Sequence, residues 1–208
     1  MQLAKAYRIE TERLVIRCYK PEDAALLKAS IDESLEHLKP WMTWAMNEPE
    51  DLEAKVNRMR KYRGQFDLGI DYVYGIFNPA ETILIGSSGL HTGPGENVRE
   101  IGYWINVHHL NQGYATEVAK ALTKVGFEIE ELERIEIRCT SNNFRSQNVP
   151  KKLGYIHEAT LRDRSLDSYG KKRDLMIWTM FRGDYVEKPI KDIEIKVFDM
   201  FGGRIEIG

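Results

Sequence analysis

A short turn rich in small residues is the first place where this chain could bind an anion. It reads LNQGYATE over residues 110–117, and it precedes a stretch in which aliphatic residues recur at helical spacing as far as Ile129. The first N–H groups of a helix have no partner within the helix, and the helix dipole is positive at that end. Gly113 and Ala115 let the backbone approach a phosphate closely, so the pattern predicts a phosphate-binding helix start.

This turn differs from the two common nucleotide-binding motifs. No G-x-G-x-x-G fingerprint is present, and no Gly-Lys-Ser/Thr follows Gly113. An ordinary glycine at the start of a helix remains the alternative, and the residues alone leave both interpretations open. Other chemistry has less support, because the five histidines show no metal-ligand spacing and no Ser/His/Asp arrangement is apparent. Cys139 falls on a strand that we expect to be buried, where a thiol is inert.

The elements that must position this turn alternate in a recognisable order. Hydrophobic periodicity and turn residues predict one strand, two helices, three strands, a helix, a strand, a short helix and two strands. The strands are expected at 13–19, 72–77, 83–90, 99–107, 134–140, 155–162 and 175–181, and the helices at about 21–39, 49–62, 113–132 and 146–153. One strand–helix–strand unit in an otherwise antiparallel run indicates an α/β (α+β) fold with a mixed, mostly antiparallel sheet flanked by about four helices.

Length and composition exclude several classes of protein. The chain has 208 residues and a formal net charge of -2, so no overall basic excess favours direct nucleic-acid binding. Two cysteines, Cys18 and Cys139, are too few for a disulfide framework. No secretory signal and no apolar run of membrane-spanning length is seen. These features predict a cytoplasmic protein with no membrane partner.

Several motifs together resemble the GNAT acetyltransferase superfamily. Its acyl-CoA pyrophosphate loop is Arg/Gln-x-x-Gly-x-Gly/Ala, and Gly113, Tyr114 and Ala115 match its last three positions, whereas Leu110 departs at the first. That departure is common in the RimJ/RimL-like branch of ribosomal-protein N-terminal acetyltransferases. The segments that are typical of that branch are TERLVIR at 11–17, EIGYW at 100–104, GYATE at 113–117, and N-x-x-S-x-x-V-x-x-KLGY at 143–155. The later G-x-x-x-D at 170–174 also fits.

The resemblance covers roughly residues 8–183 and implies a site for acetyl-CoA, with no metal. In this superfamily two central strands splay apart and acyl-CoA lies in the gap. The pantetheine arm would pair with the backbone from Ile105 to Val107, and Asn143 would hydrogen-bond the arm. The diphosphate would lie on the N–H groups of the loop, which come from Gln112, Gly113, Tyr114, Ala115 and Thr116.

The resemblance also implies two catalytic residues. Glu100 is the candidate base for the attacking amine, directly or through a water molecule, and Ser146 is the candidate that protonates or supports the departing thiolate. The alternatives are that Glu100 is an exposed strand carboxylate and that Ser146 only caps its helix. Pro150 adds a question of geometry: a helix that begins near Ser146 accommodates it, whereas one that begins at Asn142 must bend.

The acceptor is the least defined part of the expected reaction. Trp41 and Trp44 lie where the superfamily walls the acceptor site, although paired tryptophans also occur in cores. The expected function is N-acetylation of a primary amine, including the α-amine of a protein N-terminus. The alternatives are a drug, polyamine or amino-acid acetyltransferase and a non-catalytic acyl-CoA-binding protein. We expect a monomer or homodimer with an acetyltransferase domain at 8–185, followed by a β-hairpin extension at 186–208 that has no assigned role.

Overall fold

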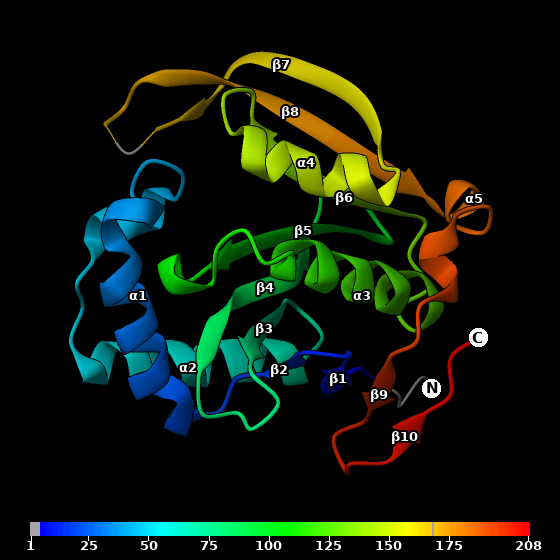
Figure 1. Cartoon of the computed structure of the whole chain (residues 1–208), viewed down its shortest axis with the longest axis horizontal. Helices are drawn as coiled ribbons and strands as arrows, with labels where there is room; N and C mark the ends of the chain where they lie inside the picture. The colour runs from blue at the N-terminus through cyan, green and yellow to red at the C-terminus, as the bar shows by residue number, and fades with distance from the viewer. Residues whose placement is uncertain (1–4, 168) are drawn as a thin grey trace.

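The computed structural model describes residues 5–167 and 169–208 and shows one mixed sheet with helices on both faces (Figure 1). The helices in the described part of the chain are α1 (Ala24–Leu38), α2 (Leu52–Asp67), α3 (Tyr114–Glu128), α4 (Phe144–Leu153) and the short α5 (Arg182–Tyr185). The strands are β1 (Arg8–Glu10), β2 (Val15–Cys18), β3 (Tyr72–Phe77), β4 (Leu84–Thr92), β5 (Val98–Ile105), β6 (Arg134–Thr140), β7 (Ile156–Leu166), β8 (Lys172–Phe181), β9 (Lys196–Phe198) and β10 (Arg204–Ile205).

The strand order confirms the expected mixed, mostly antiparallel sheet. The ten strands follow the order β10-β9-β1-β2-β3-β4-β5-β6-β8-β7. Among the described strands, only β5 and β6 pair in parallel, because α3 connects them as a crossover. The sheet is not closed: β7 and β8 lie at one end and the pair β9 and β10 at the other, near the C-terminus (Figure 1).

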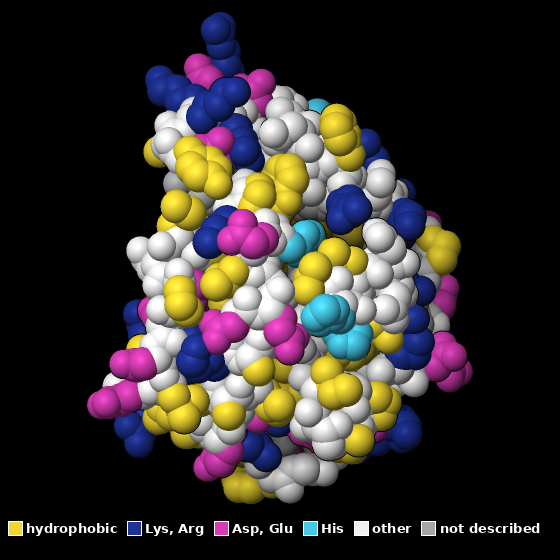
Figure 2. Space-filling view, turned by 60° about the vertical axis from the view of Figure 1, so that its left-hand side comes forward, with side chains coloured by type: hydrophobic (Ala, Val, Ile, Leu, Met, Phe, Trp, Pro, Cys, Tyr) yellow, Lys and Arg dark blue, Asp and Glu magenta, His cyan; other side chains and the backbone are white. Residues whose placement is uncertain are grey.

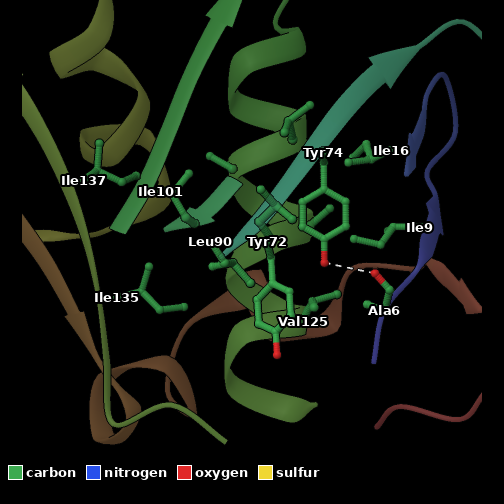
Figure 3. Packing of buried hydrophobic residues seen from close by; sticks show 14 of the residues in the cluster. Ala6, Ile9, Ile16, Tyr72, Tyr74, Leu90, Ile101, Val125, Ile135 and Ile137 are labelled. Atoms are coloured by element: carbon green, nitrogen blue, oxygen red, sulfur yellow. Dashed lines mark hydrogen bonds between the residues drawn. The ribbon is translucent and has the colours of Figure 1, made fainter. Parts of the chain in front are cut away.

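The two faces of the sheet have separate hydrophobic cores. On one face α3 supplies Val118, Leu122 and Val125, which pack with strand residues such as Ile101 and Ile135. Figure 3 shows part of this core, in which the Tyr74 hydroxyl donates a hydrogen bond to the Ala6 carbonyl at 3.0 Å. On the other face, α1 and α2 pack against β2, β3 and the start of β4. Adjacent strand residues point to opposite faces, so β2, β3 and β4 contribute buried side chains to both cores.

The parallel pair β5–β6 separates after three residues. Its register runs from Val98 opposite Arg134 to Glu100 opposite Glu136, yet the strands continue to Ile105 and Thr140. Beyond Glu100, β5 keeps only its pairing with β4. The Asn106 N–H bonds to the Ile85 carbonyl on the β4 side. Since neighbouring residues direct their peptide groups to opposite sides, those of Tyr103 and Ile105 face the gap left by β6. The sheet is therefore splayed where the sequence predicted.

The helix α4 begins between the two starts considered from the sequence. It runs from Phe144, and its N-cap is Asn143, whose side-chain Oδ1 accepts from the Ser146 N–H at 3.1 Å. Ser146 is thus the third residue of the helix, and the capping role belongs to Asn143. Pro150 lies inside the helix, and Gly154 ends it in the left-handed conformation with φ of +79°.

Two elements were not predicted from the sequence. The strand β1 (Arg8–Glu10) pairs with β2 on one side and β9 on the other, and the short helix α5 follows β8. Residues 196–205 form the antiparallel pair β9–β10, and this pair extends the main sheet through β1. The tail is thereby part of the same sheet as the rest of the chain.

Candidate active site

A cavity of about 570 Å³ opens beside the gap between β5 and β6. Elements from both sheet faces contribute to its wall: the end of α1 and the loop after it, the end of β5, the turn before α3, and α4. The predicted site residues that line it are Trp41, Ile105, Gln112, Gly113, Tyr114, Ala115, Thr116, Asn143 and Ser146. Figure 2 shows hydrophobic and histidine side chains gathered near the middle of the molecular face toward α1.

The turn before α3 is built as an open helix start. Gly113 is the N-cap of α3 and has a φ of +83°, a conformation that favours glycine over residues with a side chain. No side chain among the described residues caps this helix start. The N–H groups of Tyr114, Ala115 and Thr116 therefore have no intrahelical partner, and these three residues line the cavity. This arrangement fits a diphosphate.

Arg13 is a residue of this turn that sequence reasoning did not assign a role. Its guanidinium donates to the Gln112 carbonyl at 3.1 Å, pairs with Glu117 at 2.5 Å, and lies over the Tyr114 ring at 4.6 Å from the centroid. Its side chain remains 43% exposed. The segment 11–17 is typical of the family, but Arg13 and Glu117 are about a hundred residues apart, so the sequence did not predict their contact.

Ser146 faces the cavity from the first turn of α4, with Tyr103 of β5 as its neighbour. The Tyr103 hydroxyl lies 3.1 Å from the Ser146 carbonyl oxygen and 3.1 Å from its Oγ. Asn143 also lines the cavity, although its Oδ1 is engaged by the Ser146 N–H. Burial raises the pKa of Tyr103, and the hydrogen bond with Ser146 lowers it only in part. The phenol is therefore protonated at neutral pH.

Glu100 lies where β5 and β6 part, but it does not line the cavity described above. By strand alternation it shares a face with Trp104, which packs toward α1 and α2. Its carboxylate is 31% exposed and lies 3.5 Å from the Arg138 guanidinium. Burial raises the pKa of Glu100, the positive charges of Arg138 and His91 lower it, and Glu136 raises it; the net direction is upward.

The remaining predicted residues separate into different environments. Trp41 lines the cavity, with the Arg173 guanidinium over its ring at 5.5 Å. Trp44 instead packs against the second core and against Trp104, with ring centroids 6.2 Å apart. Val107 begins a 3-10 turn (Val107–His109), and its N–H donates to Ser34 Oγ at 3.0 Å. Neither Trp44 nor Val107 is part of the cavity wall.

His37 is a second residue that the sequence did not single out. It lies at the end of α1 in the cavity wall. Burial lowers the pKa of His37, and the nearby Arg145 cation lowers it further. The imidazole is consequently neutral near pH 7 and is able to accept a proton. His109 also lines the cavity, and only the folded chain distinguishes these two histidines from the others.

Two further properties concern the described residues as a whole. No group of three or more His, Cys, Asp or Glu side chains within 5–167 and 169–208 is arranged to hold a metal ion. None of the helices in this part of the chain is long and apolar enough to cross a membrane.

Comparisons with known proteins agree with this geometry. The family model for the acetyltransferase (GNAT) domain matches residues 13–156. The Bacillus subtilis protein YdaF is 29% identical over 177 residues, covering 84% of this chain and 94% of YdaF. The ribosomal-protein-serine acetyltransferase of Escherichia coli is 28% identical over 127 residues, covering 60% of this chain and 70% of that protein.

A solved structure shares the fold. RimL, a ribosomal L7/L12 alpha-N-protein acetyltransferase solved in complex with coenzyme A, has a TM-score of 0.75 at 17% sequence identity, covering 82% of this chain and 95% of RimL. The family match spans more than half of the chain, and it confirms the resemblance first seen in the motifs. The chain therefore belongs to the GNAT acetyltransferase family.

Proposed function

We propose that this chain transfers the acetyl group of acetyl-CoA to a primary amine by direct attack of the amine on the thioester. The observation that carries the proposal is the uncapped start of α3, which opens on the same cavity as Ser146, beside the gap between β5 and β6. A phosphate-binding helix start and an exposed strand edge in one cavity suit a long ligand with a diphosphate at one end and an amide-bearing arm at the other.

In this proposal the chain binds acetyl-CoA through three groups of atoms. The diphosphate accepts hydrogen bonds from the N–H groups of residues 113–116, with the positive charge of Arg13 nearby. The amides of the pantetheine arm pair with the peptide groups of Tyr103 and Ile105 that β6 leaves free. The thioester then lies beside Ser146.

The chemical step forms one carbon–nitrogen bond and breaks one carbon–sulfur bond. The neutral amine attacks the thioester carbonyl, and the electron pair of the broken bond leaves on sulfur. Glu100 takes the proton that the nitrogen loses, directly or through water, and Ser146 gives its hydroxyl proton to the sulfur. Water returns a proton to Ser146 and takes the one held by Glu100, so the products are an amide and coenzyme A.

We propose the α-amine of a protein N-terminus as the acceptor class. The names of the Escherichia coli relative and of RimL, which both refer to acetylation of ribosomal proteins, support this choice. Chemistry supports it as well, because an α-amine has a pKa of about 7.7–8.0, whereas that of lysine is about 10.4. At neutral pH an α-amine is therefore neutral far more often, which suits a carboxylate base of modest strength.

The test is coenzyme A release from acetyl-CoA with a matched panel of acceptors. The panel contains short peptides with Ser, Ala or Met at a free N-terminus, the same peptides with a blocked N-terminus and one lysine, and small amines including a polyamine. Turnover confined to the free N-terminal peptides supports the proposal. Turnover with small amines alone assigns a small-molecule acceptor, and binding of acetyl-CoA without turnover on any acceptor removes the enzymatic role.

A further inference from the structure

The carbonyl of Ser146 lacks the partner that a regular helix would give it. In an α-helix the carbonyl of residue i accepts from the N–H of residue i+4, which for Ser146 is residue 150. Pro150 has no N–H, so this bond does not form, although both residues lie within α4. A carbonyl withdrawn from water without a hydrogen-bond partner destabilises the fold.

Tyr103 supplies the missing donor from the neighbouring strand. Its hydroxyl approaches the Ser146 carbonyl and the Ser146 Oγ at the same distance, 3.1 Å. The phenol donates to the carbonyl, and between the two hydroxyl oxygens either one can be the donor; when it is Tyr103, its single proton is shared between the two acceptors. The N–H of Ser146 is held by Asn143. Side chains thus bind both the N–H and the carbonyl of Ser146.

The shared bond has a consequence for the Ser146 hydroxyl. When Tyr103 donates to Oγ, that oxygen acts as an acceptor toward β5, and its own proton must point elsewhere. Two directions remain: the cavity, which both Tyr103 and Ser146 line, and the neighbouring Cys139 thiol, with which the Ser146 side chain also interacts. Asn143 and Tyr103 also fix the backbone from which this hydroxyl projects.

We propose that Tyr103 is a positioning residue for Ser146. Its hydroxyl replaces the donor that Pro150 lacks and orients Oγ so that the serine proton is presented to the departing sulfur. This inference rests on the catalytic role proposed above for Ser146. Tyr103 acts through Ser146 and does not itself transfer the proton.

The experiment combines Tyr103→Phe, Pro150→Ala and their double variant, measured for kcat, for KM of acetyl-CoA and for melting temperature. Tyr103→Phe should lower kcat about tenfold, equal to about 1.4 kcal/mol, with KM within twofold. It should also lower the melting temperature by about 2–4 °C, because the Ser146 carbonyl loses its donor. In the Pro150→Ala background, the new N–H takes that carbonyl. There, Tyr103→Phe should no longer lower the melting temperature but should still lower kcat.

Two controls separate this inference from its alternatives. Tyr74→Phe removes another buried tyrosine–carbonyl hydrogen bond (Figure 3). Tyr74 is not part of the cavity wall, so this variant should lower stability without changing kcat. Ser146→Ala tests the underlying role. If Ser146→Ala is impaired but Tyr103→Phe turns over at the wild-type rate, the positioning role is wrong. If Pro150→Ala restores both stability and kcat to Tyr103→Phe, the tyrosine only satisfies the carbonyl. Wild-type turnover by Ser146→Ala overturns the proposed function of Ser146 itself.

Discussion

On the sheet face covered by α3 and α4, the gap between β5 and β6 is bordered by the uncharged hydroxyls of Tyr103 and Ser146. On the opposite face the same gap begins at Glu100, which lies among Glu136, Arg138 and His91. A group that gives a proton to sulfur needs only an oriented hydroxyl, whereas a group that takes one from an amine needs a titratable oxygen. In the mechanism proposed above, the two halves of the reaction would therefore be served from opposite faces.

The largest effect should come from the charged face. Glu100→Gln removes the proposed base and should lower kcat by about 10²–10⁴-fold, while the Kd for acetyl-CoA stays within twofold. The base must be ionised, so the wild-type rate should fall as the pH drops through the pKa of Glu100. An ordinary glutamate has a pKa of about 4.3. Because the pKa of Glu100 is raised, the rate should begin to fall at a higher pH than it would with an ordinary glutamate, and the variant should lack this fall. Stopped-flow or steady-state pH profiles check both points.

Glu10→Gln is the matched control, because Glu10 is also a strand glutamate, is 31% exposed and contacts an arginine. It should leave kcat and the pH profile unchanged. If Glu100→Gln keeps the wild-type rate at every pH, the base lies elsewhere. His37, neutral in the cavity wall, then becomes the residue to replace.

A smaller effect should follow from the uncharged face. Ser146→Ala should slow turnover with acetyl-CoA by roughly 10–100-fold. An activated aryl thioester that still binds should partly restore the rate, since a low-pKa thiolate needs little protonation as it leaves. Glu100→Gln should show no such recovery. If Ser146→Ala slows turnover equally with acetyl-CoA and with the aryl thioester, Ser146 has only a structural role. The two faces would then not serve separate halves of the reaction.

The next effect should be on the affinity of the turn before α3 for acetyl-CoA. Gly113→Glu places a carboxylate where the diphosphate should lie, and acetyl-CoA should bind at least tenfold more weakly, about 1.4 kcal/mol by calorimetry. The φ of +83° strains most side chains, so Gly113→Asn serves as the control, because asparagine tolerates this conformation without adding charge. Equal losses in the two variants would assign the effect to the backbone, and unchanged affinity in folded Gly113→Glu would remove the phosphate site.

The smallest effect should be electrostatic. Arg13→Met removes a partly exposed charge beside the turn and should weaken acetyl-CoA binding about threefold at low salt, and less at high salt. The double variant with Glu117→Gln should bind more tightly than Arg13→Met, because the carboxylate that Arg13 neutralised is also gone. Titrations at two ionic strengths check this, and a salt-independent loss would show that Arg13 acts by packing on Tyr114.

The sequence predicted the elements that have a strong local pattern. The helical spacing of Val118, Leu122 and Val125 predicted α3, and alternating residues predicted the central strands β2 to β6. The gap between β5 and β6 was expected only from the resemblance to the GNAT superfamily. It did not predict β1, because three residues at Arg8–Glu10 are too few to show a period and are held as a strand only by β2 and β9.

The sequence predicted those site residues that have a local pattern of their own. Gly113 and Ser146 have local signals, whereas Arg13–Glu117 and Tyr103–Ser146 are contacts between distant segments that only the fold brings together. The separation of Trp41 from Trp44 likewise depends on a 3-10 turn at Thr43–Asn47, which points one ring to the cavity wall and packs the other against Trp104. The spacing of Trp41 and Trp44 in the sequence does not show whether one ring or both rings face the cavity.

The position of β1 between β2 and β9 has a consequence for how the chain folds during synthesis. Arg8 pairs with Phe198, so the second edge of β1 stays unpaired until residues 196–198 have emerged from the ribosome. The buried Lys124 of α3 then donates to the carbonyls of Lys191 and Gly208 and fastens the tail to the helix that begins at Gly113. Completion of the sheet is therefore a late event, and it stabilises the same helix whose start we propose as the phosphate site.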